Sequence, residues 1–188
     1  IGDGTGDTTT FTGGLDMTAG GSENLAGTII ATNQQIDVGA ANVSADATID
    51  GGSGASNLGA MTLSDGATLT VGTGGSGAPT ITSVSGTASG TASNLTLNTT
   101  GTASVGAVGT DLGTVTVTQS GGTTFSSTVD TGTSVVLTDT TGTIQFDGAL
   151  TTPTLTTAAA GYNVSLLGGS TITNAVTILN TGTLKLGD

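Results

Sequence analysis

The 188-residue chain contains no cysteine, histidine, arginine or tryptophan, and Lys185 is its only basic residue. Zinc sites built from cysteine and histidine, thiol nucleophiles, imidazole bases and arginine clamps are therefore excluded. Neutralising the phosphates of a nucleic acid takes many lysine or arginine side chains, so the sequence predicts no nucleic-acid partner. The same scarcity argues against docking on anionic lipid. We expect a protein that is not an enzyme.

Charged residues and long apolar runs are scarce as well. Only 7% of the residues are charged, and the formal net charge is −12. No run of about 18 apolar residues occurs, which predicts no membrane insertion. A mean hydropathy of +0.25 is too apolar for ordinary disorder. Without cysteine, redox chemistry says nothing of the compartment, but an acidic, lysine-poor composition is typical of exported proteins. We expect an extracellular or cell-surface location.

Glycine, threonine and serine make up about half of the chain, with 34, 44 and 17 copies. Short segments that alternate apolar with polar residues recur between glycine, asparagine and aspartate residues. Examples are residues 61–63, 68–71, 95–97, 115–117, 135–137, 171–173 and 183–186. Alternation with period two in β-branched residues predicts strands. No segment has the i, i+3, i+4 pattern of an amphipathic helix, so the predicted fold is all-β.

The strands follow a repeat of about 20 residues. A small turn residue followed by threonine or alanine marks most repeats, with successive spacings of 19, 20, 20, 15, 21, 20, 19 and 21 residues; the markers are Gly27, Asp46, Gly66, Gly86, Gly101, Gly122, Gly142, Gly161 and Gly182. This periodicity predicts a right-handed parallel β-helix, or β-solenoid, with coils of about 20 residues over a single domain, 1–188. A rival fold, two immunoglobulin-like sandwiches, needs a larger aromatic core and leaves the repeat unexplained.

Stacked coils explain the composition, because strands about 4.8 Å apart bring identical side chains into contact and make stacked like charges repel. We expect one apolar column three positions after the marker, formed by Ile30, Ile49, Leu69, Phe125 and Val164. The coils marked by Gly86 and Gly101 lack this apolar residue and flank the short spacing, so we expect an irregular region there. The acidic residues at corners are predicted turn formers: Asp46, Asp50, Asp65, Asp130 and Asp139.

The two ends of the sequence resemble each other. Residues 1–3, Ile-Gly-Asp, nearly repeat residues 186–188, Leu-Gly-Asp. Neither end has a helical or strongly charged cap, although the ends of a solenoid expose unpaired backbone and core. We therefore expect the chain to be one unit of a longer tandem array or filament, whose partners are copies of itself joined through the solenoid ends.

Several runs resemble bacterial surface β-solenoid proteins. They are residues 7–14 (DTTTFTGG), 121–125 (GGTTF) and 180–188 (NTGTLKLGD). The similar families are filamentous-haemagglutinin-type adhesins, autotransporter passenger domains and giant β-strand-repeat surface proteins. The resemblance lies in composition and period over nearly the whole chain. It implies a right-handed parallel β-helix, export, and a role as a stalk, fibre or adhesin, and it transfers no binding residue.

The candidate sites are few. Asp3 and Asp7, on a glycine-rich turn, form a candidate calcium loop, and no other cofactor is expected. A glycosidase pair among Asp46, Asp50 and Asp65 is disfavoured, because no arginine, histidine or aromatic platform accompanies it. Thr-x-Thr runs resemble those of ice-binding solenoids. Because their distance along the sequence from the glycine marker varies, we expect that they form no clean two-column rank of threonines.

The sequence thus leads to two functional hypotheses. The first is a structural repeat unit of an extracellular surface fibre, sheath or adhesin stalk, acting as a rigid rod that assembles end to end. The alternative is a ligand-binding β-solenoid module that takes ice or a polysaccharide. A glycan or host-surface ligand is left open by both hypotheses.

Overall fold

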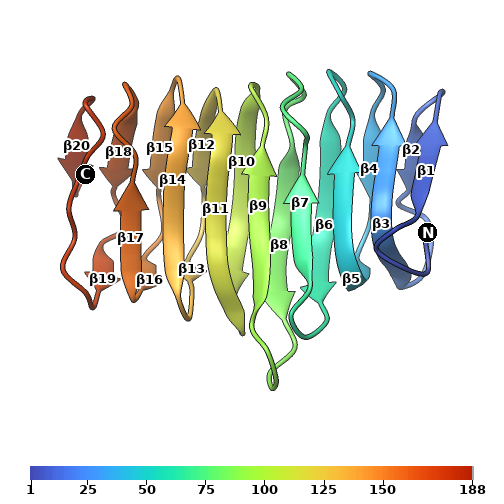
Figure 1. Ribbon diagram of the computed structural model, residues 1–188, viewed down its shortest axis with the longest axis horizontal. Helices are drawn as coiled ribbons and strands as arrows, with labels where there is room; N and C mark the ends of the chain where they lie inside the picture. Colours follow the sequence, from blue (N-terminus) through green and yellow to red (C-terminus); the bar gives the residue numbers. More distant parts are fainter. Residues whose placement is uncertain (188) are drawn as a thin grey trace.

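The computed structural model describes residues 1–187, and Asp188 lies outside the described residues. These residues form twenty strands and no helix, and every strand pair is parallel. In Figure 1 the strands in front run upward, those behind run downward, and the chain advances from right to left. That sense of winding is right-handed. The predicted right-handed parallel β-helix is confirmed.

The coils together form three parallel ladders, which we name by their place in Figure 1. The front ladder contains β1 (Thr8–Phe11), β3 (Glu23–Ala31), β5 (Ala41–Asp50), β7 (Thr68–Val71), β9 (Ser93–Asn98), β11 (Leu112–Ser120), β14 (Ser134–Thr140) and β17 (Thr154–Thr157).

The upper back ladder has nine rungs, which are β2 (Leu15–Met17), β4 (Ile36–Val38), β6 (Ser56–Leu63), β8 (Thr80–Gly86), β10 (Thr102–Gly109), β12 (Gly122–Phe125), β15 (Thr143–Phe146), β18 (Asn163–Leu166) and β20 (Leu184–Leu186). At about 4.8 Å per rung, this ladder is roughly 38 Å long from first to last strand. Nine rungs over this chain mean coils of about 20 residues, as predicted.

The lower back ladder uses the remaining segments. It pairs the first parts of β3 and β5 with the second parts of β6, β8 and β10, and it ends with β13 (Val129–Asp130), β16 (Leu150–Thr152) and β19 (Ser170–Ile172). The predicted alternating segments fall in strands, except for Thr173, which follows the last residue of β19, and Thr183, which precedes the first residue of β20.

One continuous hydrophobic cluster fills the coil from Leu25 to Leu166. Phe125 and Phe146, on successive rungs, stack with ring centroids 4.7 Å apart. Tyr162 is fully buried; its hydroxyl donates to the Leu137 carbonyl and accepts the Ala158 amide, both at 3.0 Å. Burial raises the pKa of Tyr162 above its ordinary value of 10.0. The interior is therefore packed rather than hollow.

The predicted apolar column is wrong as a single column. Ile49 stacks on Ile29, whereas Ile30 stacks on Asp50 and is only half-buried. Phe125 and Val164 belong to the upper back ladder, not to the front. The corners differ in length from coil to coil. A residue at a fixed distance from the marker along the sequence therefore falls in different ladders in different coils.

The predicted irregular region is confirmed. Residues 87–92 connect β8 to β9 without a strand and extend beyond the edge of the rod, at the lowest point of Figure 1. On the next coil, the pairing of β9 with β11 shifts register between Leu112 and Thr114 and again between Val117 and Gln119. The extra residues of the loop are therefore excluded from the stack, and the ladders continue past it.

Candidate functional site

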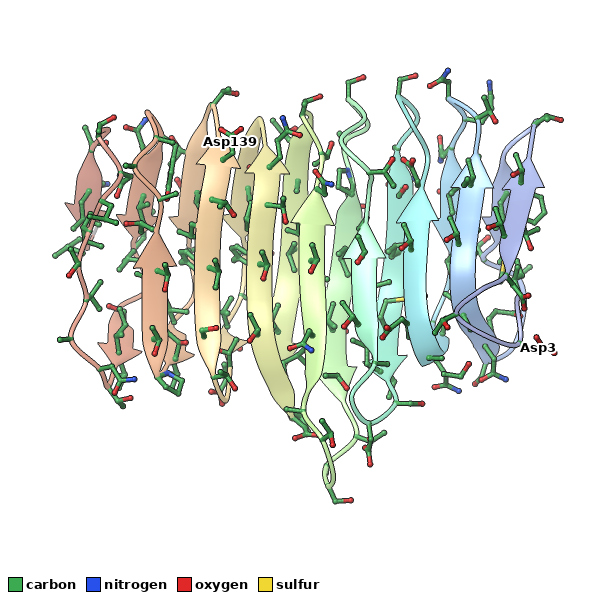
Figure 2. The ribbon with its side chains drawn as sticks, viewed as in Figure 1. Asp3 and Asp139 are labelled. Atoms are coloured by element: carbon green, nitrogen blue, oxygen red, sulfur yellow. The ribbon has the colours of Figure 1, made fainter. Side chains whose placement is uncertain are left out.

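The predicted calcium loop places its two carboxylates in one turn before β1. The Asp7 carboxylate accepts a hydrogen bond from the Asp3 amide at 2.9 Å, and this bond lowers the pKa of Asp7 below its ordinary value of 3.8. Figure 2 shows Asp3 at the lower corner of the N-terminal end. Among residues 1–187, no three histidine, cysteine, aspartate or glutamate residues group in a way that could hold a metal. Calcium binding here stays a prediction.

Corner carboxylates join one coil to the next. Asp46 accepts the Thr68 amide at 2.8 Å, and Asp65 accepts the Thr87 hydroxyl. Asp50 makes both kinds of contact, because it accepts the amide two residues on, at 2.8 Å, and a hydroxyl of the following coil. Asp65 lies in a turn as predicted, whereas Asp46 and Asp50 lie in β5, so the prediction is wrong for these two. The acceptor oxygens of all three residues connect successive coils.

The other two predicted turn formers, Asp130 and Asp139, lie in strands as well. Asp130 is the second residue of β13, and Asp139 is near the end of β14, where Figure 2 shows it at the upper edge of the front ladder. Both side chains are exposed. An aspartate tolerates an outward strand position at a ladder end because its carboxylate stays in water.

A nearly unbroken threonine column runs along the outer surface of the front ladder. Its eight neighbouring positions are Thr8, Thr28, Thr48, Thr70, Thr96, Thr116, Val136 and Thr156. These side chains are half-buried or exposed. Strand spacing places neighbouring residues about 4.8 Å apart, so the column presents hydroxyl and methyl groups at a regular interval.

A second polar column lies two residues earlier along the same strands. Its neighbouring positions are Thr68, Asn94, Thr114, Ser134 and Thr154. The Thr114 and Ser134 hydroxyls are 3.2 Å apart. A separation of two residues along a strand is about 6.7 Å. The front ladder therefore carries two polar columns, but the second spans only five rungs and contains Asn94 and Ser134. As expected, the two columns do not form a clean threonine rank. The remaining runs, at Thr80 and Thr171, lie on the back ladders.

The ends of the rod expose hydrophobic side chains. On the last rung, Leu184 and Leu186 are 41% and 68% exposed, and Leu179 of the same coil is 50% exposed. On the first rung, Leu15 and Met17 are only partly buried against the core. Within residues 1–187, neither β2 nor β20 has a second strand neighbour. Both ends therefore present an unpaired strand edge beside uncovered apolar side chains.

Opposite charges lie at the two ends of one outward column on the upper back ladder. The column consists of Asp16, Asp37, Asn57, Thr80, Ser104, Thr124, Gln145, Ser165 and Lys185. This arrangement is not among the features predicted from the sequence. Its signal was available, because residues 15–17 (Leu-Asp-Met) and 184–186 (Leu-Lys-Leu) share an apolar–charged–apolar pattern with opposite charges.

Hydrogen bonds hold the acidic end of this column. The Asp16 carboxylate accepts the Thr18 amide at 3.0 Å and the Thr18 hydroxyl at 2.7 Å, and these bonds lower the pKa of Asp16 below 3.8. Asp37 accepts the Asn57 side-chain amide at 2.7 Å. Asp16 is therefore ionised at neutral pH and stands directly beside a second carboxylate.

No family model, curated protein or solved structure matches this chain. The described residues contain no helix that is long and apolar enough to cross a membrane. A pocket between the glycine-rich corners near Asp50 and Thr99 has a volume of about 10 Å³, which is room for about one water molecule.

Proposed function

We propose that this protein is a structural rod unit of an extracellular fibre, sheath or adhesin stalk, and that it joins end to end with copies of itself. The observation that carries the proposal is the pair of ends. Each offers an unpaired strand edge together with apolar side chains that a further coil would cover. Burial of apolar surface favours that contact, by about 25 cal/mol per Å².

The composition supports an exposed, mechanical role. Acidic residues on the surface keep a long rod soluble through mutual repulsion, and the formal net charge of this unit is −12. Contacts between successive coils run the full length of the molecule, so the stack resists bending. The extracellular location rests on the resemblance of the sequence to exported bacterial solenoids.

The direct experiment measures assembly of the 188-residue chain by sedimentation velocity and electron microscopy over a range of concentrations. We expect rods whose lengths are multiples of one unit. The variant Leu186→Asp is expected to remain a single unit, because the new carboxylate would be buried unpaired at the junction. It should fold normally, since Leu186 is 68% exposed in the single unit.

Thr128→Asp is the matched control, because it adds the same charge at an exposed position in the middle of the rod. It should assemble like the wild type. A wild-type chain that stays monomeric at every concentration tested contradicts the proposal.

A second candidate function is supported by the threonine column and the shorter polar column beside it on the front ladder. Hydroxyl and methyl groups at fixed intervals of about 4.8 and 6.7 Å form a rigid, repetitive surface. Such a surface matches a ligand that is itself a regular lattice, and ice is the ligand we assign to it. This function would occupy the side of the rod and leave its ends free, so the two candidates are compatible.

A further inference from the structure

The end rungs of the upper back ladder have complementary side chains. Lys185 stands in the middle of β20, and Asp16 stands at the matching position of β2, on the same outward column. The inward neighbours also match, because Leu184 and Leu186 occupy the columns that begin with Leu15 and Met17. A coil added to β20 in the existing register would continue all three columns.

On the last rung, the hydrogen bonds to β18 show which backbone amides and carbonyls are left free. The Val164 amide donates to the Thr183 carbonyl, and the Gly187 amide donates to the Leu166 carbonyl, both at 2.9 Å. Backbone groups alternate in direction along a strand. The amides and carbonyls of Leu184 and Leu186 therefore point away from β18, toward the outer edge.

The first rung has the complementary arrangement. The Leu15 amide donates to the Gln35 carbonyl at 3.0 Å, and the Gly39 amide donates to the Met17 carbonyl at 3.4 Å. These residues face β4, so the amide and carbonyl of Asp16 point to the outer edge. In a parallel ladder, the backbone amide and carbonyl of one residue bond to the two residues that flank its paired residue on the neighbouring strand. Asp16 can thus donate to the Leu184 carbonyl and accept from the Leu186 amide.

Only one register pairs the free backbone groups of both rungs and also places Lys185 opposite Asp16. A slip of one residue breaks the hydrogen-bond alternation and turns the charged side chain toward the core. A slip of two residues keeps the bonds but moves Lys185 opposite Gly14 or Thr18 instead of Asp16. In the unshifted register, Lys185 also offsets the repulsion between Asp16 and its neighbour Asp37.

We propose that β20 of one copy adds in parallel to β2 of a second copy, head to tail, with Lys185 of the first opposite Asp16 of the second. This inference rests on the proposed end-to-end assembly and specifies its polarity and register. The occupant of the exposed end is a second copy of this chain. The chain's single lysine then has a defined role, which is to select the register of the junction.

Charge reversal tests the register. Lys185→Glu puts two carboxylates together at the junction, and Asp16→Lys puts two ammonium groups together. Each variant alone should need about tenfold more protein to assemble than the wild type. An equal mixture of the two should regain wild-type assembly, because every alternating junction then joins opposite charges.

Asp139→Lys is the matched control, since it makes the same change of charge at an exposed mid-rod position. It should assemble like the wild type. Circular dichroism of each variant reports whether the fold is retained. Recovery in the mixture excludes a folding defect, because misfolded chains do not assemble by being mixed.

Chemical cross-linking gives a second readout. A carbodiimide joins amines to carboxylates, and the chain offers only Lys185 and the N-terminal amine. We expect a Lys185–Asp16 cross-linked peptide as the main product. In rods formed from equal amounts of ¹⁴N- and ¹⁵N-labelled chains, half of the copies of this cross-linked peptide should join a ¹⁴N-labelled segment to a ¹⁵N-labelled segment.

The outcomes separate the two proposals. Absence of assembly in the wild type contradicts both the assembly and its register. Assembly that is insensitive to both reversals, or cross-links from Lys185 to other carboxylates only, overturns the register and leaves the rod function standing. Failure of the mixture to recover indicates a junction other than head to tail and also overturns this inference.

Discussion

Threonine stabilises this molecule both inside and outside the coil. Inside, hydroxyls bond across successive coils, as in the 2.8 Å contacts of Thr131 with Thr152 and of Ser120 with Thr140. Such partners remove most of the cost of burying a hydroxyl. Outside, hydroxyls also bond to the neighbouring rung, as Thr80 does to Asn57 at 2.8 Å. A residue that serves both environments explains why 44 threonines suit one fold.

Glycine is required at certain corners rather than merely tolerated. Gly72 has a φ of +83°, and a Cβ there would lie 2.3 Å from the carbonyl oxygen of Asn98. Gly72→Ala is expected to lower the free energy of unfolding by about 2 kcal/mol or more, from the left-handed backbone and the clash. Thermal or denaturant unfolding measures the difference.

Gly13→Ala is the matched substitution, because a Cβ at Gly13 meets nothing within 4 Å and its φ is not left-handed. It should change stability by less than about 1 kcal/mol. Equal losses at the two positions would contradict the assigned role of Gly72.

At the scale of strands and corners, prediction from the sequence is correct where a segment is short and strictly alternating. β7, β9 and β11 cover residues 68–71, 95–97 and 115–117 as predicted. It failed where a corner changes length, because a marker residue then no longer stays in one ladder. The threonine column shows the effect, since Thr70 and Thr96 are neighbours 26 residues apart, whereas Thr96 and Thr116 are 20 apart.

The front ladder carries the prediction for ice binding. The wild-type chain should show thermal hysteresis and shape ice crystals. Thr96→Lys, in the middle of the column, should remove most of the hysteresis, because a long charged side chain breaks the regular surface. Val136→Thr completes the column and should increase the hysteresis.

The control for this test is Thr124→Lys, which places the same side chain on the upper back ladder. It should leave the hysteresis unchanged. Hysteresis absent from the wild type, or lost equally in both lysine variants, contradicts ice binding by the front ladder and has no bearing on end-to-end assembly.

At the scale of the whole molecule, stability comes from contacts between neighbouring coils. A solenoid of this kind unfolds from its ends, because an end coil has one neighbour and a central coil has two. The C-terminal coil has the less regular backbone of the two ends, since residues 173–183 contain no strand, and Leu179, Leu184 and Leu186 are exposed.

Hydrogen exchange of single units should therefore show a gradient. Amides in residues 173–187 should exchange fastest, and those of β11 and β14 slowest, because local opening costs least where fewest contacts are lost. The assembly-deficient variant Leu186→Asp is suited to this measurement. Uniform protection along the chain contradicts this account. In assembled wild-type rods, the gradient should flatten as each end gains a neighbour.

The sequence by itself determined the class of fold. Period-two alternation requires strands, a repeat near 20 residues requires stacked coils, and stacking at about 4.8 Å excludes columns of like charge. Only the tertiary structure decided which residues become neighbours, because corners of unequal length set the register and no local pattern reports them. The threonine column and the alignment of Asp16 with Lys185 exist only in that register, so the surfaces on which the proposals rest follow from it.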